Sequence, residues 1–500
     1  MFEVFTKAIA SCITPQALLV MGIGTVAGLV VGALPGLSST MGVALAIPIT
    51  FGMDPKLGLM LLGAVYCSSV YGGSLTAILL RTPGTDASIA TTFDGFPMTQ
   101  KGLGGKAIGV STTGSFFGGI VSVFALLFLA PPLAKVALKF GSAEYFLVAI
   151  FGLSVIISIS SASYLKGLIS GMFGLLLSTC GMDGFTGYAR FIFDNDSLLD
   201  GIPLLPALIG LFSLSQAIKI AVEKDATIVK SSDVEFTDRV MPTWAEFKHL
   251  FPFMARSSII GTVIGIIPAA GTSIAAFLSY DDARRHSKHP ETFGQGNPEG
   301  VVAPETANNA VTGGSLIPAL TLAIPGNAVT AIFIGGLTIH GLIPGPSLFT
   351  KHAETTYTLI FSLFIANILF YIIGITFARQ FAKIIKTPTK ILAPVICVFS
   401  VIGSYAIRNN MLDVGILFGF GVLGYFMERY KYPASPIVLA LILGPMAESE
   451  FRRSMAVFHN SITPYFTRPL SLALIVLIVI SVAVPLYKEF KRGKAGARTQ

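Results

Sequence analysis

Long apolar runs without a single Lys, Arg, Asp or Glu dominate this 500-residue chain, and they restrict what it can fold into. A helix that crosses a bilayer needs about 20 apolar residues, because each residue adds only about 1.5 Å along the helix axis. Six runs meet or approach that length: Leu57–Leu80, Ala107–Ala134, Tyr145–Leu165, Ser257–Tyr280, Thr355–Ala378 and Leu470–Tyr487. Ala8–Met53 and Thr306–Thr350 are about twice as long, so each predicts two passes or a re-entrant hairpin.

The composition supports a membrane protein. Only 12% of the residues are charged, about half of what a soluble domain carries, and the mean hydropathy is +0.75. The runs are continuously apolar and lack the alternation of a membrane β-barrel strand. We therefore expect an all-α polytopic membrane protein with about 11–13 membrane segments, some of them re-entrant or broken. The 34 basic and 26 acidic residues fit basic cytoplasmic loops, and nucleic acid is not expected as a partner.

Three blocks rich in glycine, proline and hydroxyl side chains occur twice, in the same order. The first set is Gly32–Thr40, Tyr71–Leu75 and Thr82–Asp86, and the second set is Gly265–Ser273, Thr312–Leu316 and Ile324–Asn327. Hydrocarbon cannot satisfy a free backbone N–H or C=O, so such breaks persist only beside protein, water or a ligand. Breaks in corresponding positions of two halves predict the binding site of a transporter.

The repeated blocks also predict how the chain is divided. We expect a first transmembrane half over residues 1–222 and a second half over 251–487, pseudo-symmetric and of inverted topology. A polar linker, 223–250, joins them, and the basic tail 488–500 is expected on the cytoplasmic side. A polar insert, 281–305, predicts either a solvated loop or a regulatory or partner-binding loop, with Glu305 at its end.

Helices that restart inside the membrane would present unpaired N–H groups and the positive end of the helix dipole, which together favour anions. The candidate substrate-binding residues all lie in the repeated blocks: Gly36, Ser38, Ser39, Thr40, Arg81, Gly84, Thr85, Gly271, Thr272, Ser273, Gly326 and Asn327. Their donors are mostly neutral, which keeps the binding of an anion reversible. Four such tips converging from two halves predict a small ligand with several carboxylates.

Oxygen-bearing side chains near the same blocks are candidates for a coupling cation: Asn308, Asn309, Asp86, Ser74 and Ser315. Glu305, Asn308 and Thr312 would share one helix face. These amide and hydroxyl groups suit either Na⁺ coordination or polar contacts between helices. Asp86 either binds the cation or pairs with Arg81 at the membrane boundary, and Arg81 otherwise binds a substrate carboxylate.

Catalytic function is not expected, because no recognised catalytic, metal or ATP-binding motif occurs. The four cysteines, Cys12, Cys67, Cys180 and Cys397, sit singly in apolar segments and form no zinc spacing. An intramembrane enzyme would need a dyad such as Asp86 with Asp94 or Asp183. An ion channel or passive pore is the main alternative to a carrier, and it would need a continuous polar lining. His340 is expected to be a hydrogen-bonded residue at a helix end.

The blocks resemble those of the large membrane subunit of the tripartite tricarboxylate transporter family. The resemblance runs from Pro15 to Tyr487 and is carried by Gly32–Gly36, Tyr71–Gly84, Phe93–Met98, Glu305–Ala310, Gly313–Pro318 and Ile324–Gly326. Arg81 departs from the family pattern, which often has a neutral polar residue before Thr-Pro-Gly.

The resemblance implies a multi-pass protein of the bacterial inner membrane. Such a subunit works with a small four-span membrane subunit and a periplasmic substrate-binding protein. It imports di- and tricarboxylates such as citrate, without a cofactor, and uses Na⁺ or H⁺ as the coupling ion. We expect alternating access, in which a core that carries the tips moves against a scaffold. A homodimer and a carrier without a soluble partner are left open.

Overall fold

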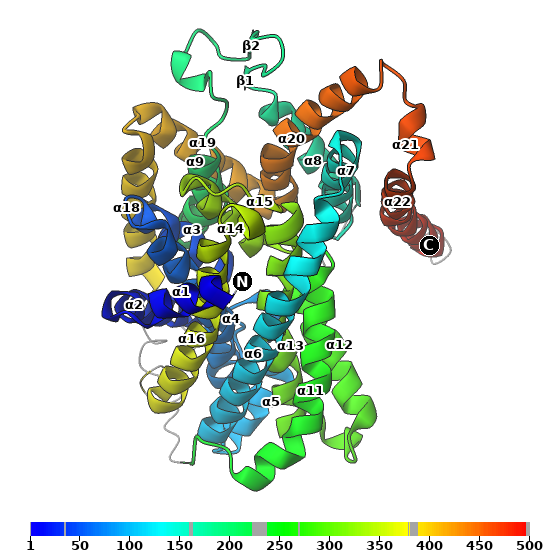
Figure 1. Ribbon diagram of the computed structural model, residues 1–500. Coiled ribbons are helices and arrows are strands. Elements are labelled where there is room, and N and C mark those ends of the chain that lie inside the picture. The colour runs from blue at the N-terminus through cyan, green and yellow to red at the C-terminus, as the bar shows by residue number, and fades with distance from the viewer. Residues whose placement is uncertain are drawn as a thin grey trace. The chain divides into compact units, whose positions relative to one another are not determined.

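The computed structural model describes residues 2–34, 37–159, 164–222, 238–268, 271–378, 380 and 389–496, and these are mostly helical (Figure 1). Seven helical segments in these ranges are long and apolar enough to cross a membrane: α2 (Pro15–Ala33), α4 (Pro55–Leu80), α6 (Gly104–Ala137), α9 to α10 (Leu204–Val222), α11 (Trp244–Ile266), α16 (Ala353–Thr376) and α19 (Met411–Arg429). Shorter apolar helices accompany them. The predicted all-α polytopic membrane class is confirmed.

The chain forms two compact units. The larger unit consists of Met1–Ala134 and Gln216–Gly403, and the smaller unit of Lys135–Ser215 and Ser404–Gln500. Each unit therefore takes residues from both predicted halves. The division into halves 1–222 and 251–487 and their inverted topology stay predictions.

The larger unit contains the interrupted helices. Besides α2, α4, α11 and α16, it holds α1 (Phe2–Ile13), α3 (Ser39–Thr50), η1 (Asp86–Ser88), α5 (Ile89–Gln100), α12 (Gly271–His286), η4 (Pro290–Thr292), α13 (Pro298–Leu322), α14 (Ala328–Ile339) and α15 (Ser347–Thr350), with most of α6 and of α18 (Thr389–Arg408). The two longest apolar runs each contain more than one helix, as expected. The run Ser257–Tyr280 is shared between α11 and α12, because the Pro268 block interrupts it.

Glycines allow two helix pairs to approach closely. A Cβ atom on Gly28 of α2 would lie 2.1 Å from Ser68 Oγ of α4, and one on Gly32 would lie 2.2 Å from the Ser69 carbonyl oxygen. In the second pair, a Cβ atom on Gly261 of α11 would lie 2.3 Å from the carbonyl oxygen of Ala307 on α13. Figure 1 shows α11, α12 and α13 side by side. In both pairs the missing side chain lets the helix backbones approach closely, as in other membrane proteins.

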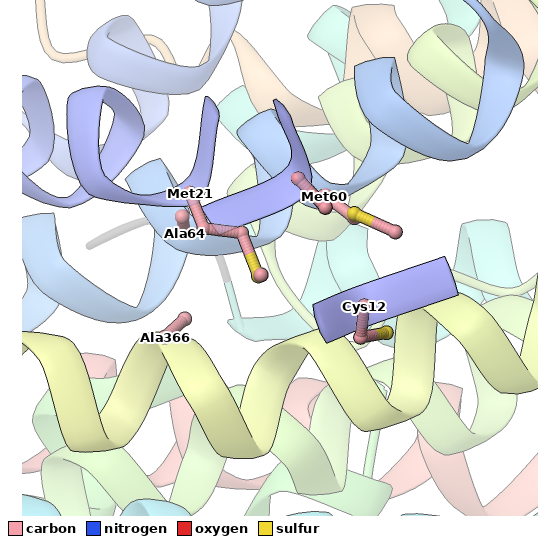
Figure 2. Packing of buried hydrophobic residues seen from close by; sticks show 6 residues of the cluster. Cys12, Met21, Met60, Ala64 and Ala366 are labelled. Atoms are coloured by element: carbon pink, nitrogen blue, oxygen red, sulfur yellow. The ribbon is translucent and has the colours of Figure 1, made fainter. Parts of the chain in front are cut away.

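Small and sulfur-bearing side chains fill the space between α1, α2, α4 and α16. Cys12, Met21, Met60, Ala64 and Ala366 are at most 1% exposed and form one cluster, shown in Figure 2. Methionine fills irregular gaps because its side chain is unbranched and flexible. Cys12 thus behaves as a small apolar residue, and its thiol donates to the Thr358 carbonyl oxygen.

The smaller unit surrounds α20. It contains α7 (Ser142–Ile159), α8 (Tyr164–Ser178), the antiparallel pair β1 (Gly181–Met182) and β2 (Ala189–Arg190), η2 (Asp196–Leu198), α9 (Leu204–Ile209), the π-helical η3 (Gly210–Leu214), α19, α20 (Ser435–Val457), α21 (Thr463–Thr467) and α22 (Pro469–Gly496). α20 packs on α7 and α8, while α19 packs on α9 and η3.

An ion-pair cluster joins the β1–β2 hairpin to α20. Asp183 accepts hydrogen bonds from the amides of Phe185 and Thr186 at 2.8 and 3.2 Å, and Arg452 Nη1 lies 2.8 Å from Asp183 Oδ2. Arg190 binds both oxygens of Glu448, at 2.8 and 3.0 Å. The Phe185 amide, followed by the Thr186 amide and the Arg452 guanidinium, lowers the pKa of Asp183 to about 2, against the opposing effect of burial.

This cluster predicts a loss of stability in acid. The folded-state pKa of Asp183 lies below the unfolded value of about 3.9, so its stabilisation is present above pH ~4 and is lost as the pH falls through ~2. Asp183→Asn is expected to lower the thermal midpoint at neutral pH and to reduce the fall in midpoint between pH ~4 and ~2. Thermal unfolding of purified protein checks this, with the exposed Asp196→Asn as control. Equal acid sensitivity of the parent and Asp183→Asn would contradict it.

Candidate functional site

The larger unit holds four helix interruptions, and they coincide with the repeated blocks. They lie between α2 and α3, between α4 and η1, between α11 and α12, and between α13 and α14. Residues 35–36 and 269–270, inside two of these breaks, are outside the described ranges. The prediction for Gly36 therefore has no structural counterpart here.

The helices α4 and α13 begin and end alike. Asp54 and Asn297 cap their N-termini, and a proline occupies the first turn of each. At the other ends, Arg81 and Ala323 adopt left-handed conformations with φ of 58° and 57°. Residues other than glycine rarely do so. Each of these residues stands three positions before the glycine of a Pro-Gly pair, so the two breaks share a local geometry.

The glycines after these helices, Gly84 and Gly326, are held against the preceding broken helix of the same half. A Cβ atom on Gly84 would lie 2.3 Å from the Gly32 carbonyl oxygen and 2.8 Å from Gly73 Cα. A Cβ atom on Gly326 would lie 2.8 Å from the Gly265 carbonyl oxygen and 2.6 Å from a side-chain carbon of α13. Gly84 N donates to the Gly73 carbonyl oxygen, so this glycine serves close packing of the tip.

Two predicted ligand-binding side chains, Ser38 and Asn327, cap restarted helices. Ser38 Oγ accepts from the Met41 amide at 3.2 Å, at the start of α3. Asn327 Oδ1 accepts from the Thr330 amide at 2.9 Å, at the start of α14. Thr85 Oγ1 and Ser88 Oγ lie 2.8 Å apart. These contacts fit helices that restart at the breaks, as the sequence predicts.

Other predicted side chains keep unused polar atoms. Thr40 in α3 and Thr272 and Ser273 in α12 make no hydrogen bond within the described ranges and are only partly buried. Ser39 Oγ is buried and has no partner among the described residues. Gly271, which begins α12, has φ +75°. Free hydroxyl groups in the first turns of two helices can donate to a bound carboxylate.

A buried polar contact joins the predicted halves. Asn327 Nδ2 donates to the hydroxyl of Tyr66 at 2.9 Å, and the same hydroxyl lies 2.9 Å from Ser315 Oγ. The first-half helix α4 is thereby linked to the tip between α13 and α14. Sequence reasoning did not identify Tyr66, since a tyrosine in an apolar run resembles a core residue.

The predicted cation residues fall into two groups. Asn308 Nδ2 donates weakly to the Val70 carbonyl oxygen at 3.5 Å, and Asn309 Nδ2 donates to that of Cys67 at 3.3 Å. The Oδ1 atoms of both asparagines are buried and lack a hydrogen-bond partner among the described residues. Orphaned amide oxygens of this kind fit a hard cation. Ser74, on α4, has hydroxyl partners of its own, since its Oγ accepts from Ser111 Oγ at 2.9 Å.

Arg81 and Asp86 do not form the pair that was considered. Within the described chain neither side chain has an ion pair, and both are exposed. Arg81 instead lies over the ring of Phe96, 5.9 Å from its centroid. A cation-binding role for Asp86 stays a prediction.

Glu305 was expected at the end of a loop, and this was wrong. The polar insert ends earlier, because Asn297 caps α13 and Pro298 begins it. Glu305 therefore lies in the second turn of α13, with 0% of its surface exposed. His340 does end a helix, and its Nε2 lies 3.1 Å from Thr50 Oγ1, as expected.

A cavity of about 540 Å³ opens beside the first tip. Its lining residues are Arg81, Thr92, Phe93, Phe96, Pro97, Gln100, Tyr280, Arg284, Phe293 and Gly294. The lining includes two arginines, which form no ion pair in the described ranges, and it includes no carboxylate. The cavity therefore favours anions. Arg284 was missed by sequence reasoning, because it lies in a charged stretch of the insert.

The carboxylates proposed for an enzyme are otherwise engaged. Asp94 Oδ1 accepts from the amides of Gly294, Gly296 and Asn297 at 2.8–2.9 Å, and Asp94 Oδ2 accepts from the Tyr280 hydroxyl at 2.8 Å. Asp183 belongs to the ion-pair cluster of the smaller unit. A carboxylate held by this many donors fixes the neighbouring segments in place.

Interrupted helices in corresponding blocks, with unused polar atoms at their ends, define a multi-pass membrane transporter. The profile described as "Tripartite tricarboxylate transporter TctA family" matches residues 18–439. The chain belongs to this family, whose members are large subunits of tripartite transporters.

Two relatives from Agrobacterium vitis are similar to the chain. The "Uncharacterized 52.8 kDa protein in TAR-I ttuC' 3'region" is 36% identical over 485 residues, which cover 96% of this chain and 95% of the relative. The "Uncharacterized protein in TAR-II ttuC' 3'region" is 35% identical over 231 residues, which cover 46% of this chain and 96% of the relative. No solved structure matches.

Proposed function

We propose that the chain is the large membrane subunit of a binding-protein-dependent secondary transporter that imports di- and tricarboxylates of the citrate type. The observation that carries the proposal is the set of interrupted helices in one compact unit, with neutral donors at their tips. Neutral donors and helix N-termini hold a carboxylate without a permanent countercharge. The partners are a small four-span membrane subunit and a periplasmic substrate-binding protein, and the location is the bacterial inner membrane.

Transport would proceed by cation-coupled alternating access. All four helix breaks belong to the larger unit, which supports this unit as the part that carries substrate and the smaller unit as a scaffold. The chain has no ATP-binding motif, so a Na⁺ or H⁺ gradient would supply the energy. The orphaned oxygens of Asn308 and Asn309 support coupling by a cation.

The cavity that contains Arg81 and Arg284 would attract the substrate toward the first tip. Arg284→Gln is expected to raise the KM for a tricarboxylate about three- to tenfold, roughly 1 kcal/mol, with kcat nearly unchanged. Kinetics of uptake by the reconstituted transporter check this. Arg285→Gln is the control, because Arg285 is exposed and pairs with Asp281 outside the cavity lining. Equal effects of the two variants would contradict the role of the cavity.

Countertransport separates a carrier from the alternative of a passive pore. Proteoliposomes loaded with unlabelled citrate would be given labelled citrate outside. A carrier is expected to show faster labelled uptake into loaded than into empty vesicles, because the loaded carrier returns with substrate. Equal, unsaturable fluxes into both would reject the carrier and favour a pore.

A further inference from the structure

Glu305 is a buried carboxylate without an opposite charge. Its side chain is fully buried in α13, and no Lys, Arg or His forms an ion pair with it in the part of the chain that is described. Burying an isolated carboxylate is costly, and proteins normally compensate it with a cation, a proton or strong donors. The compensation at Glu305 therefore needs an explanation.

Hydroxyl groups from three other helices surround this carboxylate. Thr91 Oγ1 of α5 donates to Glu305 Oε1, and Ser115 Oγ of α6 lies 3.2 Å from Oε2. Ser74 on α4 and Ser111 on α6 lie close to the carboxylate, and Ser111 Oγ donates to Ser74 Oγ at 2.9 Å. A hydroxyl can donate a hydrogen bond or offer its lone pairs, so this set can bind the carboxylate alone or share a cation with it.

Two other buried carboxylates of the larger unit show the contrast. Asp94 accepts from three backbone amides, which can only donate, and from Tyr280. Glu299, earlier on α13, lies 2.8 Å from His249 Nε2. Among the described residues Glu305 has neither a backbone donor nor a basic partner, and its hydroxyl neighbours can turn several oxygens toward a metal ion.

A second observation points to a ligand here. Asn308, one turn beyond Glu305 on the same face of α13, is 1% exposed, and its Oδ1 has no hydrogen-bond partner among the described residues. A buried amide oxygen without a donor is rare and indicates a missing partner. A small cation beside the carboxylate would satisfy both groups.

We propose that Glu305, with Asn308 Oδ1 and the hydroxyl oxygens of Ser74, Thr91, Ser111 and Ser115, binds one dehydrated Na⁺ ion. One carboxylate with neutral oxygens balances a single positive charge, and oxygen ligands suit a hard cation. Of these residues, Ser74 and Asn308 were already predicted to bind the cation, and Glu305 supplies the negative charge that the predicted set lacked at this position. Its role as the coupling site rests on the proposed function, whereas binding of Na⁺ does not.

The position of the site explains how Na⁺ would affect substrate binding. Ser74 follows Gly73, which contacts the tip glycine Gly84, and Thr91 lies in α5, which follows the same tip. A cation held between α4 and α5 would fix the two segments that flank the first break. The tip would then be ordered for a carboxylate when the cation is bound, which makes the two binding events cooperative.

Thermal unfolding of the purified full-length chain tests the site without any transport. NaCl replaces choline chloride at constant ionic strength, and KCl serves as a second series. Na⁺ is expected to raise the midpoint in the parent and in Glu299→Gln, the control on the same helix, but not in Glu305→Gln. Ser115→Ala keeps the carboxylate but removes one hydroxyl ligand. This variant is expected to need at least tenfold more Na⁺ for the same rise in midpoint. It replaces Glu305→Gln in the test if Glu305→Gln does not fold.

Each result decides the proposal. The site would be overturned if Na⁺ raised the midpoint of Glu305→Gln as much as that of the parent. If Glu305→Gln does not fold, the same result with Ser115→Ala would overturn it. A parent midpoint that depends on pH but not on Na⁺ would also overturn it and indicate a proton at Glu305. Selective Na⁺ binding in a chain that moves no carboxylate would support the site and refute the proposed function separately.

Discussion

Replacing Gly84 or Gly326 with leucine is expected to abolish carboxylate uptake while the chain still inserts into the membrane. Both positions lack room for even a Cβ atom, which would lie 2.3 Å from the Gly32 carbonyl oxygen at Gly84 and 2.6 Å from the Ser315 Cβ atom at Gly326. Overpacking of this kind costs about 1–3 kcal/mol, and here it displaces the tips themselves. Initial uptake rates into proteoliposomes give the measurement.

The alanine variants add a graded test. Gly84→Ala is expected to be more harmful than Gly326→Ala, because its closest contact is shorter, 2.3 Å from the Gly32 carbonyl oxygen against 2.6 Å from Ser315 Cβ at Gly326. Gly22→Leu is the control, since nothing lies within 4 Å of a Cβ atom on Gly22 of α2. If correctly inserted Gly84→Leu and Gly326→Leu proteins take up carboxylate at the parental rate, the closely packed tips are not required for transport.

Asn327→Asp is expected to lower carboxylate uptake at least tenfold in a chain that still folds. Aspartate keeps the oxygen that accepts from the Thr330 amide, and the Tyr66 hydroxyl can donate to it. The helix cap is therefore preserved. A new negative charge at the tip would repel the substrate by up to about 4 kcal/mol for unit charges 4 Å apart at an effective dielectric constant of ~20.

Two further substitutions separate charge from helix capping. Asn327→Ser keeps a capping oxygen without adding charge, and Asn327→Ala removes the cap at a cost of about 0.5–2 kcal/mol. Uptake kinetics and thermal midpoints of all three variants are compared. If Asn327→Asp transports as well as Asn327→Ser, the tip before α14 does not face the anion.

Local chemistry made the helix breaks predictable. Pro83-Gly84 and Pro325-Gly326 cannot continue a helix without loss of backbone hydrogen bonds, so a break follows from the residues alone. Such features depend on a few neighbours in the sequence.

Features that depend on distant residues were not predictable. Glu305 was placed in a loop because the preceding insert is polar, although the Asn297-Pro298 pair is a helix-start signal like Asp54-Pro55. Its hydroxyl partners, such as Thr91 and Ser115, come from other helices and carry no signal of their own. The two compact units, each drawn from both ends of the chain, likewise depend on tertiary packing.

Uptake of labelled citrate by proteoliposomes tests the central claim most directly. The vesicles would contain this chain and its small membrane partner, with or without the periplasmic binding protein, under a Na⁺ gradient or a pH gradient imposed separately. We predict saturable accumulation that requires the binding protein and one of the two gradients. Absence of uptake for every di- and tricarboxylate under either gradient, or flux that does not saturate, would contradict the assignment.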